Sequence, residues 1–423
     1  MWLLKDTPAL LMDLYELTMA QVYFKKNITG TAHFEVFIRS LPHNWGFFVM
    51  AGLEELNSYL ESFTFSPQDL EFLKSTNKFS NDFLEFLRNL KPSVKIRTLP
   101  EGTIFFPLEP AFEVTGPLID AQILESYTLN ILGFSIIETS LAARYSIAAA
   151  GKPLVDFGLR RAQGPLASVR AAAAAKIAGF AATSNLFASK LLDLAPTGTM
   201  AHSFIKVYGS EEQAFCDFAE TYGPDAILLV DTYDITEGIK KAASVARQFL
   251  DQKGVKIRGI RLDSGDLAES SKFAREYFKQ NKVEFLKIFA SGDLDEFKIE
   301  KLIQQGAQID GFGVGTNFSV SRYAPALDII YKLVQYEEKK VFKKSPDKQT
   351  LPGRKKLLRV KNRFFEKDIV CPIEAEGNDL LQPFTAPETV DAIKERLASQ
   401  LNCLKPPLKK IQDPDTYPVQ FNF

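Results

Sequence analysis

The stretch RGIRLDSGDLAESSKFAREYFKQNKVEFLKIFASGDLDE, residues 258–296, contains two short apolar runs with one helical segment between them. The runs RGIRL and KIFA have the length of buried strands. The intervening LAESSKFAREYFKQ repeats its apolar residues at the spacing of an amphipathic helix. Each run leads into a Ser-Gly-Asp turn, so the stretch predicts a strand, a helix and a parallel second strand.

The same plan repeats along the chain from about residue 150. Short apolar runs end in polar or Gly-bearing turns at 155–161, 179–185, 197–203, 227–234, 258–266, 287–293 and 310–316. Helical patterns connect them, which predicts an α/β fold with an irregular (β/α) barrel of about seven strands. A doubly wound open sheet is the alternative, because repetition alone does not prove closure. In a barrel, the polar turns would gather on the face where barrel enzymes assemble their sites.

The two flanks of this region have a different pattern. Residues 1–122 combine a helix, DLYELTMAQVYF, with the alternating run TAHFEVFIRSL and a β-rich stretch. After residue 325 come the strand-like IIYKLVQY, a Lys/Arg-dense segment from Lys339 to Lys367 and a Pro-rich tail. We expect 1–122 plus 325–423 to form one discontinuous, β-rich α+β domain beside the barrel of 123–324. Within the basic segment, KKVFKKSPDK (339–348) is most simply a solvated loop.

Composition restricts the class of protein. The chain has 423 residues, of which 46% are hydrophobic and 24% charged, so it is globular and large enough for one or two sizeable cores. A net charge of −1 gives no reason to expect a nucleic-acid partner. The three cysteines, Cys216, Cys371 and Cys403, lie too far apart for a CxxC zinc site and fit a reducing compartment. With no signal-length or membrane-length apolar run, we expect a cytoplasmic protein without a membrane partner.

Three turns have the composition of an anion site: RLDSGDL (261–267), ASGDLDE (290–296) and GVGT (313–316). Gly allows close backbone approach, and the helix that follows each turn offers free N–H groups to a phosphate. The Asp of either Ser-Gly-Asp could instead cap its helix. Three such turns on neighbouring strands favour a phosphate-and-sugar site over three independent caps. GFGVGT lacks the Rossmann order of glycines, and the chain contains no P-loop motif.

Two further stretches offer chemistry. TGTMAHSF (197–204) holds His202, one of only three histidines, and such a residue on its own is usually a hydrogen-bonded core side chain. FGLRRAQGP (157–165) places two adjacent arginines at a strand end, where their guanidinium forks can bind phosphates or carboxylates. Phe157 could stack on an aromatic ligand, although a strand Phe more often belongs to the core.

Taken together, these stretches resemble the nicotinate phosphoribosyltransferase family. The resemblance rests on an ordered set of motifs that covers most of the chain: DLYELTMAQ, FEVFIRSLP, FGLRRAQGP, TSN, GTMAHSF, VDTYD, RLDSGDL, SGDLDE, DGFGVGT and LPGRKK. It implies transfer of phosphoribose from phosphoribosyl pyrophosphate to nicotinate in a Mg²⁺-dependent step of NAD synthesis. It also implies that ATP hydrolysis is coupled to the transfer through phosphorylation of His202.

The resemblance further implies roles for individual residues. Phe157 would stack on one face of the pyridine ring, and Tyr15 of the neighbouring subunit would cover the other, which makes a homodimer part of the site. Arg160 would hold phosphate, and Arg261 would reach the nicotinate or ribose. Asp263 and Asp293 would bind ribose hydroxyls or Mg²⁺-pyrophosphate, with no direct protein ligand to the metal expected. The remaining expected contacts to substrate are Thr199, Ser264 and the backbone around Gly292, Gly313, Gly315 and Thr316.

One position separates nicotinate from nicotinamide. Related nicotinamide enzymes carry an Asp directly after the Gly-Thr pair, where this chain has Met200. A carboxylate there would repel the carboxylate of nicotinate, so Met200 favours the acid as substrate. The alternatives are a nicotinamide or quinolinate phosphoribosyltransferase, a non-catalytic relative that binds nucleotides, and an unrelated phosphosugar barrel enzyme. The last would need a catalytic Lys or Glu at a strand end, and none stands out.

Overall fold

The computed structural model describes residues 9–342 and 351–423, which form two compact units. One unit contains the chain up to Ser140 together with Tyr323–Phe423, and the other contains Leu141–Arg322. Residues 343–348 of the predicted basic loop lie outside the described residues. Within the described part of the chain, no helix is long and apolar enough to cross a membrane.

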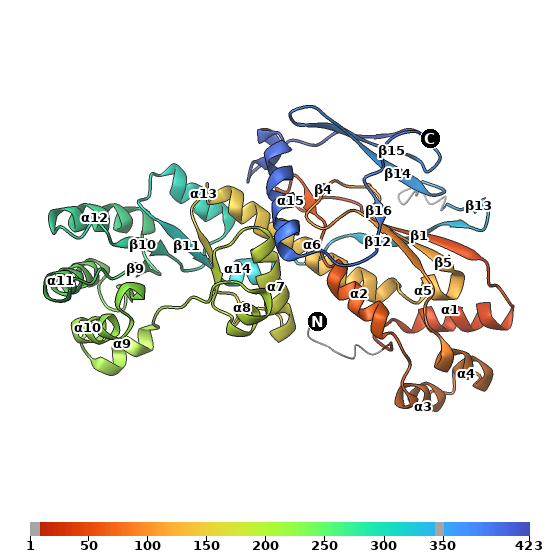
Figure 1. The fold of residues 1–423 in the computed structure, drawn as a ribbon, viewed down its shortest axis with the longest axis horizontal. Coiled ribbons are helices and arrows are strands. Elements are labelled where there is room, and N and C mark those ends of the chain that lie inside the picture. Colours follow the sequence, from red (N-terminus) through yellow and green to blue (C-terminus); the bar gives the residue numbers. More distant parts are fainter. Residues whose placement is uncertain (1–8, 343–350) are drawn as a thin grey trace. The chain divides into compact units, whose positions relative to one another are not determined.

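A six-stranded parallel sheet organises the unit Leu141–Arg322 (Figure 1). In chain order its strands are β6 (Leu154–Asp156), β7 (Ala182–Thr183), β8 (Ile227–Leu229), β9 (Gly259–Leu262), β10 (Lys287–Ala290) and β11 (Gly311–Val314). Their spatial order is β7-β6-β11-β10-β9-β8. The first strand therefore pairs with the last, as it does in a barrel, whereas a doubly wound sheet would reverse its order from a central strand. The predicted α/β barrel class is confirmed.

The sheet departs from the expected seven strands at residues 197–203. This segment contributes only a parallel bridge next to it, between Pro196 and Thr183, and it then turns into a helix that begins at His202. The hydrogen-bonded sheet is thus open between β7 and β8. Thr-Gly-Thr directly after a proline is a poor strand, because Pro lacks an N–H to donate and Gly weakens strand interiors.

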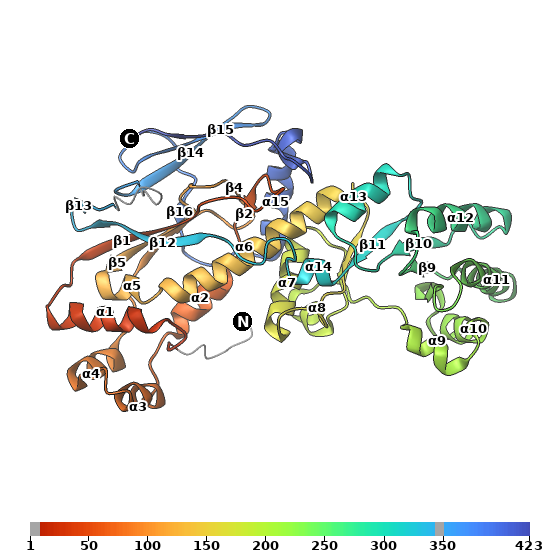
Figure 2. The ribbon, with the colours of Figure 1, turned by 180° about the vertical axis from the view of Figure 1, so that it is seen from behind.

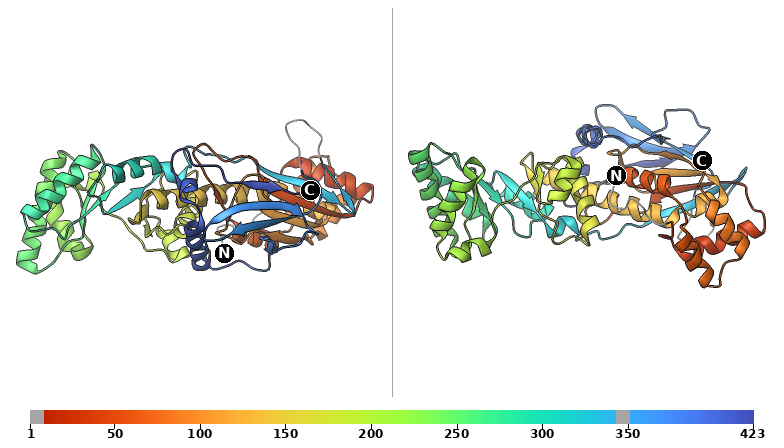
Figure 3. Two further views of the ribbon diagram at one scale, coloured as in Figure 1. Left: turned by 90° about the horizontal axis from the view of Figure 1, so that it is seen from above. Right: turned by 60° about the horizontal axis from the view of Figure 1, so that its bottom comes forward.

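Helices follow the strands of this sheet: α7 (Pro165–Ile177), α8 (Leu186–Leu192), α9 (His202–Tyr208), α10 (Glu211–Tyr222), α11 (Ile235–Lys253), α12 (Leu267–Gln280), α13 (Glu296–Gln304) and α14 (Thr316–Ser319). Three of them begin at aspartates whose side chains accept a backbone N–H, namely Asp234, Asp266 and Asp295. These caps satisfy N–H groups that the first helical turn leaves free. Figure 3 shows these strands and helices, in yellow to cyan, from two further directions.

The other unit is built on an antiparallel sheet that joins the two flanks of the chain. Its order is β13-β12-β1-β5-β3-β16, and β1 (Thr31–Ile38) lies between β12 (Ile329–Tyr336) and β5 (Phe112–Pro117), as Figure 2 shows. The predicted helix DLYELTMAQVYF is found as α1 (Leu14–Lys25), and TAHFEVFI and IIYKLVQY form β1 and β12.

The remaining strands are β2 (Phe48–Val49), β3 (Lys95–Thr98), β4 (Ile104–Phe105), β13 (Lys339–Lys340), β14 (Lys355–Lys361), β15 (Phe365–Pro372), β16 (Gln382–Pro383) and β17 (Val419–Phe421). The remaining helices are α2 (Leu53–Ser62), α3 (Pro67–Ser75), α4 (Asn81–Asn89), α5 (Leu118–Gln122), α6 (Glu125–Ala148) and α15 (Val390–Cys403). Helix α6 contributes residues to both units.

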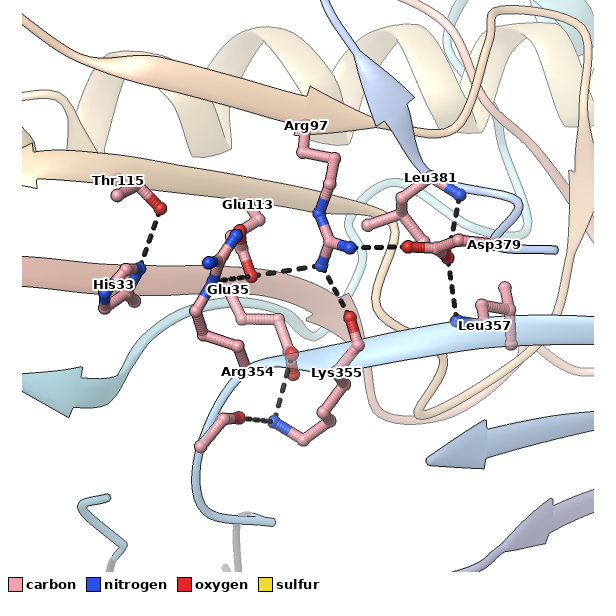
Figure 4. A network of polar contacts seen from close by, with 11 residues as sticks. His33, Glu35, Arg97, Glu113, Thr115, Arg354, Lys355, Leu357, Asp379 and Leu381 are labelled. Atoms are coloured by element: carbon pink, nitrogen blue, oxygen red, sulfur yellow. Dashed lines mark hydrogen bonds and ion pairs between the residues drawn. The ribbon is translucent and has the colours of Figure 1, made fainter. Parts of the chain in front are cut away.

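The LPGRKK motif (351–356) takes part in a buried ion-pair network of this unit (Figure 4). Glu113 of β5 accepts hydrogen bonds from Arg97 at 3.2 Å and from Arg354 at 2.7 Å. Lys355 donates to Glu35 of β1 at 3.0 Å, and both side chains are almost fully buried. A buried charge without its partner is strongly destabilising, so these pairs fix β14 against the sheet of β1 and β5. Part of the predicted basic segment is therefore structural and not solvated.

Candidate active site

The polar turns of the parallel sheet meet at the carboxyl ends of its strands. β9, β10 and β11 are consecutive neighbours, and β11 pairs with β6, so the two Ser-Gly-Asp turns, GVGT and FGLRR lie side by side. A cavity of about 700 Å³ lies within this unit, and its lining includes Phe157, Thr199, Arg261, Phe289 and Gly313. A largely apolar hollow with a few polar side chains in its lining is the usual form of a small-molecule site.

His202 is the first residue of α9, and 40% of its side chain is exposed. Nδ1 lies 3.1 Å from the hydroxyl of Thr232, and Nε2 lies 3.9 Å from Oδ2 of Asp263. A lone histidine is usually a buried, hydrogen-bonded core residue, and for His202 this expectation is wrong because much of its side chain is exposed. One nitrogen is oriented by a hydroxyl, and the other faces a carboxylate on a neighbouring turn.

Asp263 is held by two neighbouring strand ends. Its backbone N–H donates to Oδ2 of Asp231 at 3.1 Å, and its Oδ1 accepts a short hydrogen bond from the hydroxyl of Ser291. Ser264 also donates to Oδ2 of Asp231, at 2.5 Å. The second oxygen of Asp231 is buried and has no hydrogen-bond partner in the described part of the chain. Such an oxygen is costly to leave unsatisfied, and this marks Asp231 as a group poised for a ligand.

The two Ser-Gly-Asp turns differ in what their aspartates do. In the first turn Asp266 caps α12, as the structural alternative predicts. In the second turn the cap is Asp295, and Asp293 adopts a positive φ of 50°. Asp293 accepts hydrogen bonds from Lys298 at 3.0 Å and from Asn317 at 3.0 Å. The Lys298 ammonium lowers the pKa of Asp293, which is therefore an ionised residue whose carboxylate is already paired.

Phe157 is half-buried, and its ring lies directly against Gly313. A Cβ at Gly313 would come within 2.3 Å of the ring, so only glycine leaves room for it there. The preceding Asp156 is buried, accepts the N–H of Gly158 at 2.7 Å and accepts the hydroxyl of Thr183 at 2.7 Å. These contacts fix the turn after β6 and hold the Phe157 ring at the cavity wall.

The cationic residues of the site differ in burial. Arg261 is largely buried, and this burial lowers the pKa of its guanidinium, while Asp263 and Asp231 favour the charged form. Its guanidinium donates a long hydrogen bond, 3.4 Å, to the carbonyl of Met200, and its Nε is buried without a partner among the described residues. Arg160 is exposed and close enough to Arg261 to repel it. Two such cations side by side suit a polyanionic ligand.

Sequence comparison assigns the family. The profile of the nicotinate phosphoribosyltransferase N-terminal domain matches residues 10–133, and the profile of the nicotinate phosphoribosyltransferase family matches residues 153–367. The chain is 40% identical to nicotinate phosphoribosyltransferase pncB2 of Mycobacterium tuberculosis (strain ATCC 25618 / H37Rv), over 97% of this chain and 91% of that protein. The chain belongs to the nicotinate phosphoribosyltransferase family. It is also 38% identical to the Bacillus subtilis (strain 168) nicotinate phosphoribosyltransferase, over 88% of this chain and 78% of that one.

Solved structures of this family share the fold. Human nicotinic acid phosphoribosyltransferase superposes with a TM-score of 0.83 at 25% identity, covering 97% of each chain. The nicotinate-nucleotide pyrophosphorylase from Pyrococcus furiosus superposes with a TM-score of 0.74 at 26% identity, covering 93% of this chain and 94% of that one. The α/β fold and the family resemblance are thereby confirmed, and an unrelated phosphosugar barrel enzyme is excluded.

The expected site residues of this nicotinate phosphoribosyltransferase family member fall into two sets. One set lies on the parallel-sheet unit at or beside the strand ends: Phe157, Arg160, Thr199, His202, Arg261, Asp263, Ser264, Gly292, Asp293, Gly313, Gly315 and Thr316. Tyr15, on α1, belongs to the other unit, and 43% of its surface is exposed.

Sequence reasoning did not assign roles to Asp231, Thr232 or Asp156. Asp231 and Thr232 belong to VDTYD, which was recognised only as part of the family pattern. The sequence offered a signal for both, because they lie just after the buried run of β8. In the structure Asp231 contacts the turn after β9, and Thr232 contacts His202. Asp156 ends β6 itself, so its apolar neighbours conceal it in the sequence.

Proposed function

We propose that this protein is an ATP-coupled nicotinate phosphoribosyltransferase that forms nicotinate mononucleotide and pyrophosphate from nicotinate and phosphoribosyl pyrophosphate. The observation that supports it most directly is the convergence of His202, Asp263 and Arg261 at one end of the parallel sheet. The step would take place in the cytoplasm, within NAD salvage.

His202 is the proposed phosphoryl carrier. Its Nδ1 faces the Thr232 hydroxyl, so a proton on Nδ1 leaves the lone pair on Nε2. In this proposal Nε2 attacks the γ-phosphorus of ATP, the bond to the β,γ-bridging oxygen breaks, and ADP leaves. Water later takes the phosphoryl group from Nε2 and releases phosphate. Asp263, at 3.9 Å from Nε2, would accept the proton that Nε2 carries when the imidazole is protonated.

Transfer of the sugar requires stabilisation of positive charge at C1 and of the departing pyrophosphate. The ring nitrogen of nicotinate forms the bond to C1, and the bond from C1 to the pyrophosphate oxygen breaks with its electron pair going to pyrophosphate. Arg261 and Arg160 would stabilise that leaving group, and Asp263 would bind ribose hydroxyls. The ring of Phe157, held against Gly313, would position the nicotinate for in-line attack.

The residues present fit a magnesium ion that is bound mainly through substrate. No group of three or more His, Cys, Asp or Glu side chains able to hold a metal occurs in the described ranges 9–342 and 351–423. The unpartnered buried oxygen of Asp231 is a carboxylate oxygen, the kind of ligand that Mg²⁺ prefers. Mg²⁺ would neutralise pyrophosphate charge there, with waters completing its shell.

Substrate choice and assembly complete the proposal. Met200 is buried and contributes only its carbonyl to Arg261, so no acidic side chain from this position opposes a carboxylate ligand. Nicotinate is therefore the proposed acceptor. Tyr15 of a second copy would close the site over the pyridine ring, which makes a homodimer the active assembly.

The test is a product assay with matched substrates. Purified protein receives phosphoribosyl pyrophosphate and Mg²⁺ with nicotinate, nicotinamide or quinolinate, each with and without ATP. We expect mononucleotide from nicotinate, stimulation by ATP, and acid-labile phosphate that is lost in His202→Ala. Equal turnover of nicotinamide contradicts the assignment of substrate, and wild-type phosphate labelling in His202→Ala contradicts the role of His202.

A further inference from the structure

The start of helix α1 is tied to the start of helix α6 by an unusual set of contacts. Ser126 of α6 accepts a hydrogen bond from the backbone N–H of Asp13 at 3.1 Å. Both the hydroxyl and the backbone N–H of Ser126 donate to Oε1 of Glu16, the latter at 3.1 Å. Asp13, which precedes α1, makes no side-chain cap of its own. The first turn of α1 therefore depends on Ser126 and Glu16 for its anchoring.

Tyr15 lies between these anchored positions and points the other way. Glu16 is fully buried, whereas Tyr15 keeps 43% of its surface exposed, since successive residues of a helix are rotated by about 100°. Burial, and then the nearby charge of Glu125, the neighbour of Ser126, raises the pKa of the Tyr15 hydroxyl. Glu125 is in turn bound by Gln122 at 2.9 Å. Ser126 of α6 thus holds the Asp13 backbone on one side of Tyr15 and the Glu16 side chain on the other, and Glu125 lies near the Tyr15 hydroxyl.

Burying the Glu16 carboxyl group in this anchor is energetically unfavourable. Its second oxygen, Oε2, is buried and has no hydrogen-bond partner in the described part of the chain. The hydroxyl of Tyr59 on α2, which lies within reach of the charge of Glu16, is likewise buried without a partner. An apolar residue would avoid the penalty of an unsatisfied buried oxygen. A carboxyl group retained at this cost indicates a demand for the contacts to Ser126.

We propose that Glu16 and Ser126 are positioning residues that fix the Tyr15 ring for its place over the nicotinate of the neighbouring subunit. This inference rests on the proposed function, in which Tyr15 acts across the dimer. Neither residue touches substrate. They act by holding residues 13–16 in one conformation before nicotinate binds, so that the ring need not be ordered on binding.

The environment of Glu16 also makes the anchor dependent on pH. Burial raises the pKa of its carboxyl to about 7. The groups that interact with its charge are Asp13, Glu125, Tyr15, Tyr59 and Tyr331, and a basic residue, Lys332, acts on Glu125. Below pH 7 the neutral acid fits this acidic surrounding. As pH rises through 7, ionisation leaves a buried charge that the Ser126 hydrogen bonds only partly offset, and the nearby charge of Glu125 adds repulsion, so the anchored conformation is weakened.

The first test compares KM values. Loss of one stacking ring costs about tenfold in affinity or more, so Tyr15→Ala sets the full effect. We expect Glu16→Ala and Ser126→Ala to raise the KM for nicotinate towards that of Tyr15→Ala and to leave the KM for phosphoribosyl pyrophosphate within about twofold. Gln21→Ala is the matched control. Gln21 ties the same helix at 3.0 Å to the Lys78 carbonyl and at 2.7 Å to the Ser80 N–H, so its loss should leave both KM values unchanged.

The second test uses pH and the conservative variant. Glu16→Gln keeps an oxygen for Ser126 and cannot ionise, so it should recover the wild-type KM for nicotinate at pH 6.5 to 7. The wild-type KM should rise between pH 7 and 8.5, and the Glu16→Gln KM should not. Identical pH profiles for the two proteins overturn the proposal, even if Glu16→Ala fails to fold.

The third test asks whether the anchor acts across the dimer. Glu16→Ala and Asp263→Asn subunits with different tags are co-expressed, and mixed dimers are purified. One site of each mixed dimer then combines an intact barrel with an intact anchor. At nicotinate concentrations below the wild-type KM, where the Glu16→Ala parent is slow, we expect about half of the wild-type turnover per dimer. Mixed dimers no more active than their parents overturn the proposal. Unaltered nicotinate KM in Tyr15→Ala instead refutes the role of Tyr15, and absence of nicotinate mononucleotide from the wild type refutes the proposed function.

Discussion

Replacing Gly292 by alanine should damage the site through the backbone of its neighbour. Gly292 has φ +92°, and a Cβ there would lie 1.9 Å from the carbonyl oxygen of Asp263 and 2.8 Å from its carbonyl carbon. Carbon atoms in contact lie about 3.5 Å or more apart, so one backbone must move by roughly 1.5 Å. The atom displaced belongs to Asp263, whose carboxylate faces His202. A misplacement of about 1 Å costs on the order of 100-fold in rate.

We therefore expect Gly292→Ala to lower kcat/KM for phosphoribosyl pyrophosphate about 100-fold, equivalent to about 2.7 kcal/mol. Gly265 provides a matched control, because it holds the same place in the first Ser-Gly-Asp turn with φ +74° and has nothing within 4 Å of a Cβ. Gly265→Ala pays only the left-handed backbone strain of about 1–2 kcal/mol. Its Tm should fall while kcat/KM stays within tenfold. Steady-state rates and thermal unfolding measure both, and equal losses of kcat/KM in the two variants would refute the reasoning.

Three further predictions concern single side chains. Thr232→Val removes the hydroxyl that orients His202, so acid-labile phosphate and the stimulation by ATP should fall about fivefold, a loss of about 1 kcal/mol, while the ATP-independent rate persists; unchanged labelling contradicts the tautomer assignment. Met200→Asp should shift the ratio of kcat/KM for nicotinamide over nicotinate upwards by about tenfold or more, measured with both acceptors. Burial and Asp368 raise the pKa of Glu109, so the protonated carboxyl group stabilises the fold at low pH. This stabilisation is lost as the pH rises above about 4.5, the ordinary pKa of a glutamate. Glu109→Gln should remove the loss, so the difference in Tm between the variant and the wild type should grow with pH.

The sequence predicted the parallel sheet because each strand, turn and helix has its own local pattern of apolar, polar and glycine residues. Six of the seven expected runs are strands, and their helices start close to the turns that follow. The exception is the run at 197–203, which the local pattern predicts as a strand and which does not form one. TGTMAHS has the polar turn of the other units, but whether its few residues pair depends on the neighbouring strands, which the local pattern does not report. The spatial order of the strands likewise follows from packing between distant segments.

For the site, the family resemblance assigned roles to Asp263, Arg261 and His202, and the structure places their side chains close together. Asp231 and Thr232 were not singled out because each is a common residue in a turn, and their value lies in what they touch. Asp231 bonds to the N–H of Asp263 and Thr232 lies against His202, and both contacts join residues about 30 positions apart. The Asp231 contact arises from the pairing of β8 with β9, and the Thr232 contact joins the end of β8 to the start of α9, so both depend on how distant segments pack.

The two Ser-Gly-Asp turns have the same three residues, but their aspartates have different structural roles. After the first turn the helix begins at once, at Leu267, and the side chain of Asp266 caps its N-terminus. After the second the helix begins only at Glu296, because Asp295 supplies the cap, and Asp293 is left in a left-handed conformation held by Lys298 and Asn317. The parallel pairing of β9 with β10, after which the Ser291 N–H donates to the Leu262 carbonyl, brings the backbone at Gly292 against the Asp263 carbonyl. The second turn therefore supports the first. A substitution in the second turn should displace Asp263 before it lowers the stability of α13.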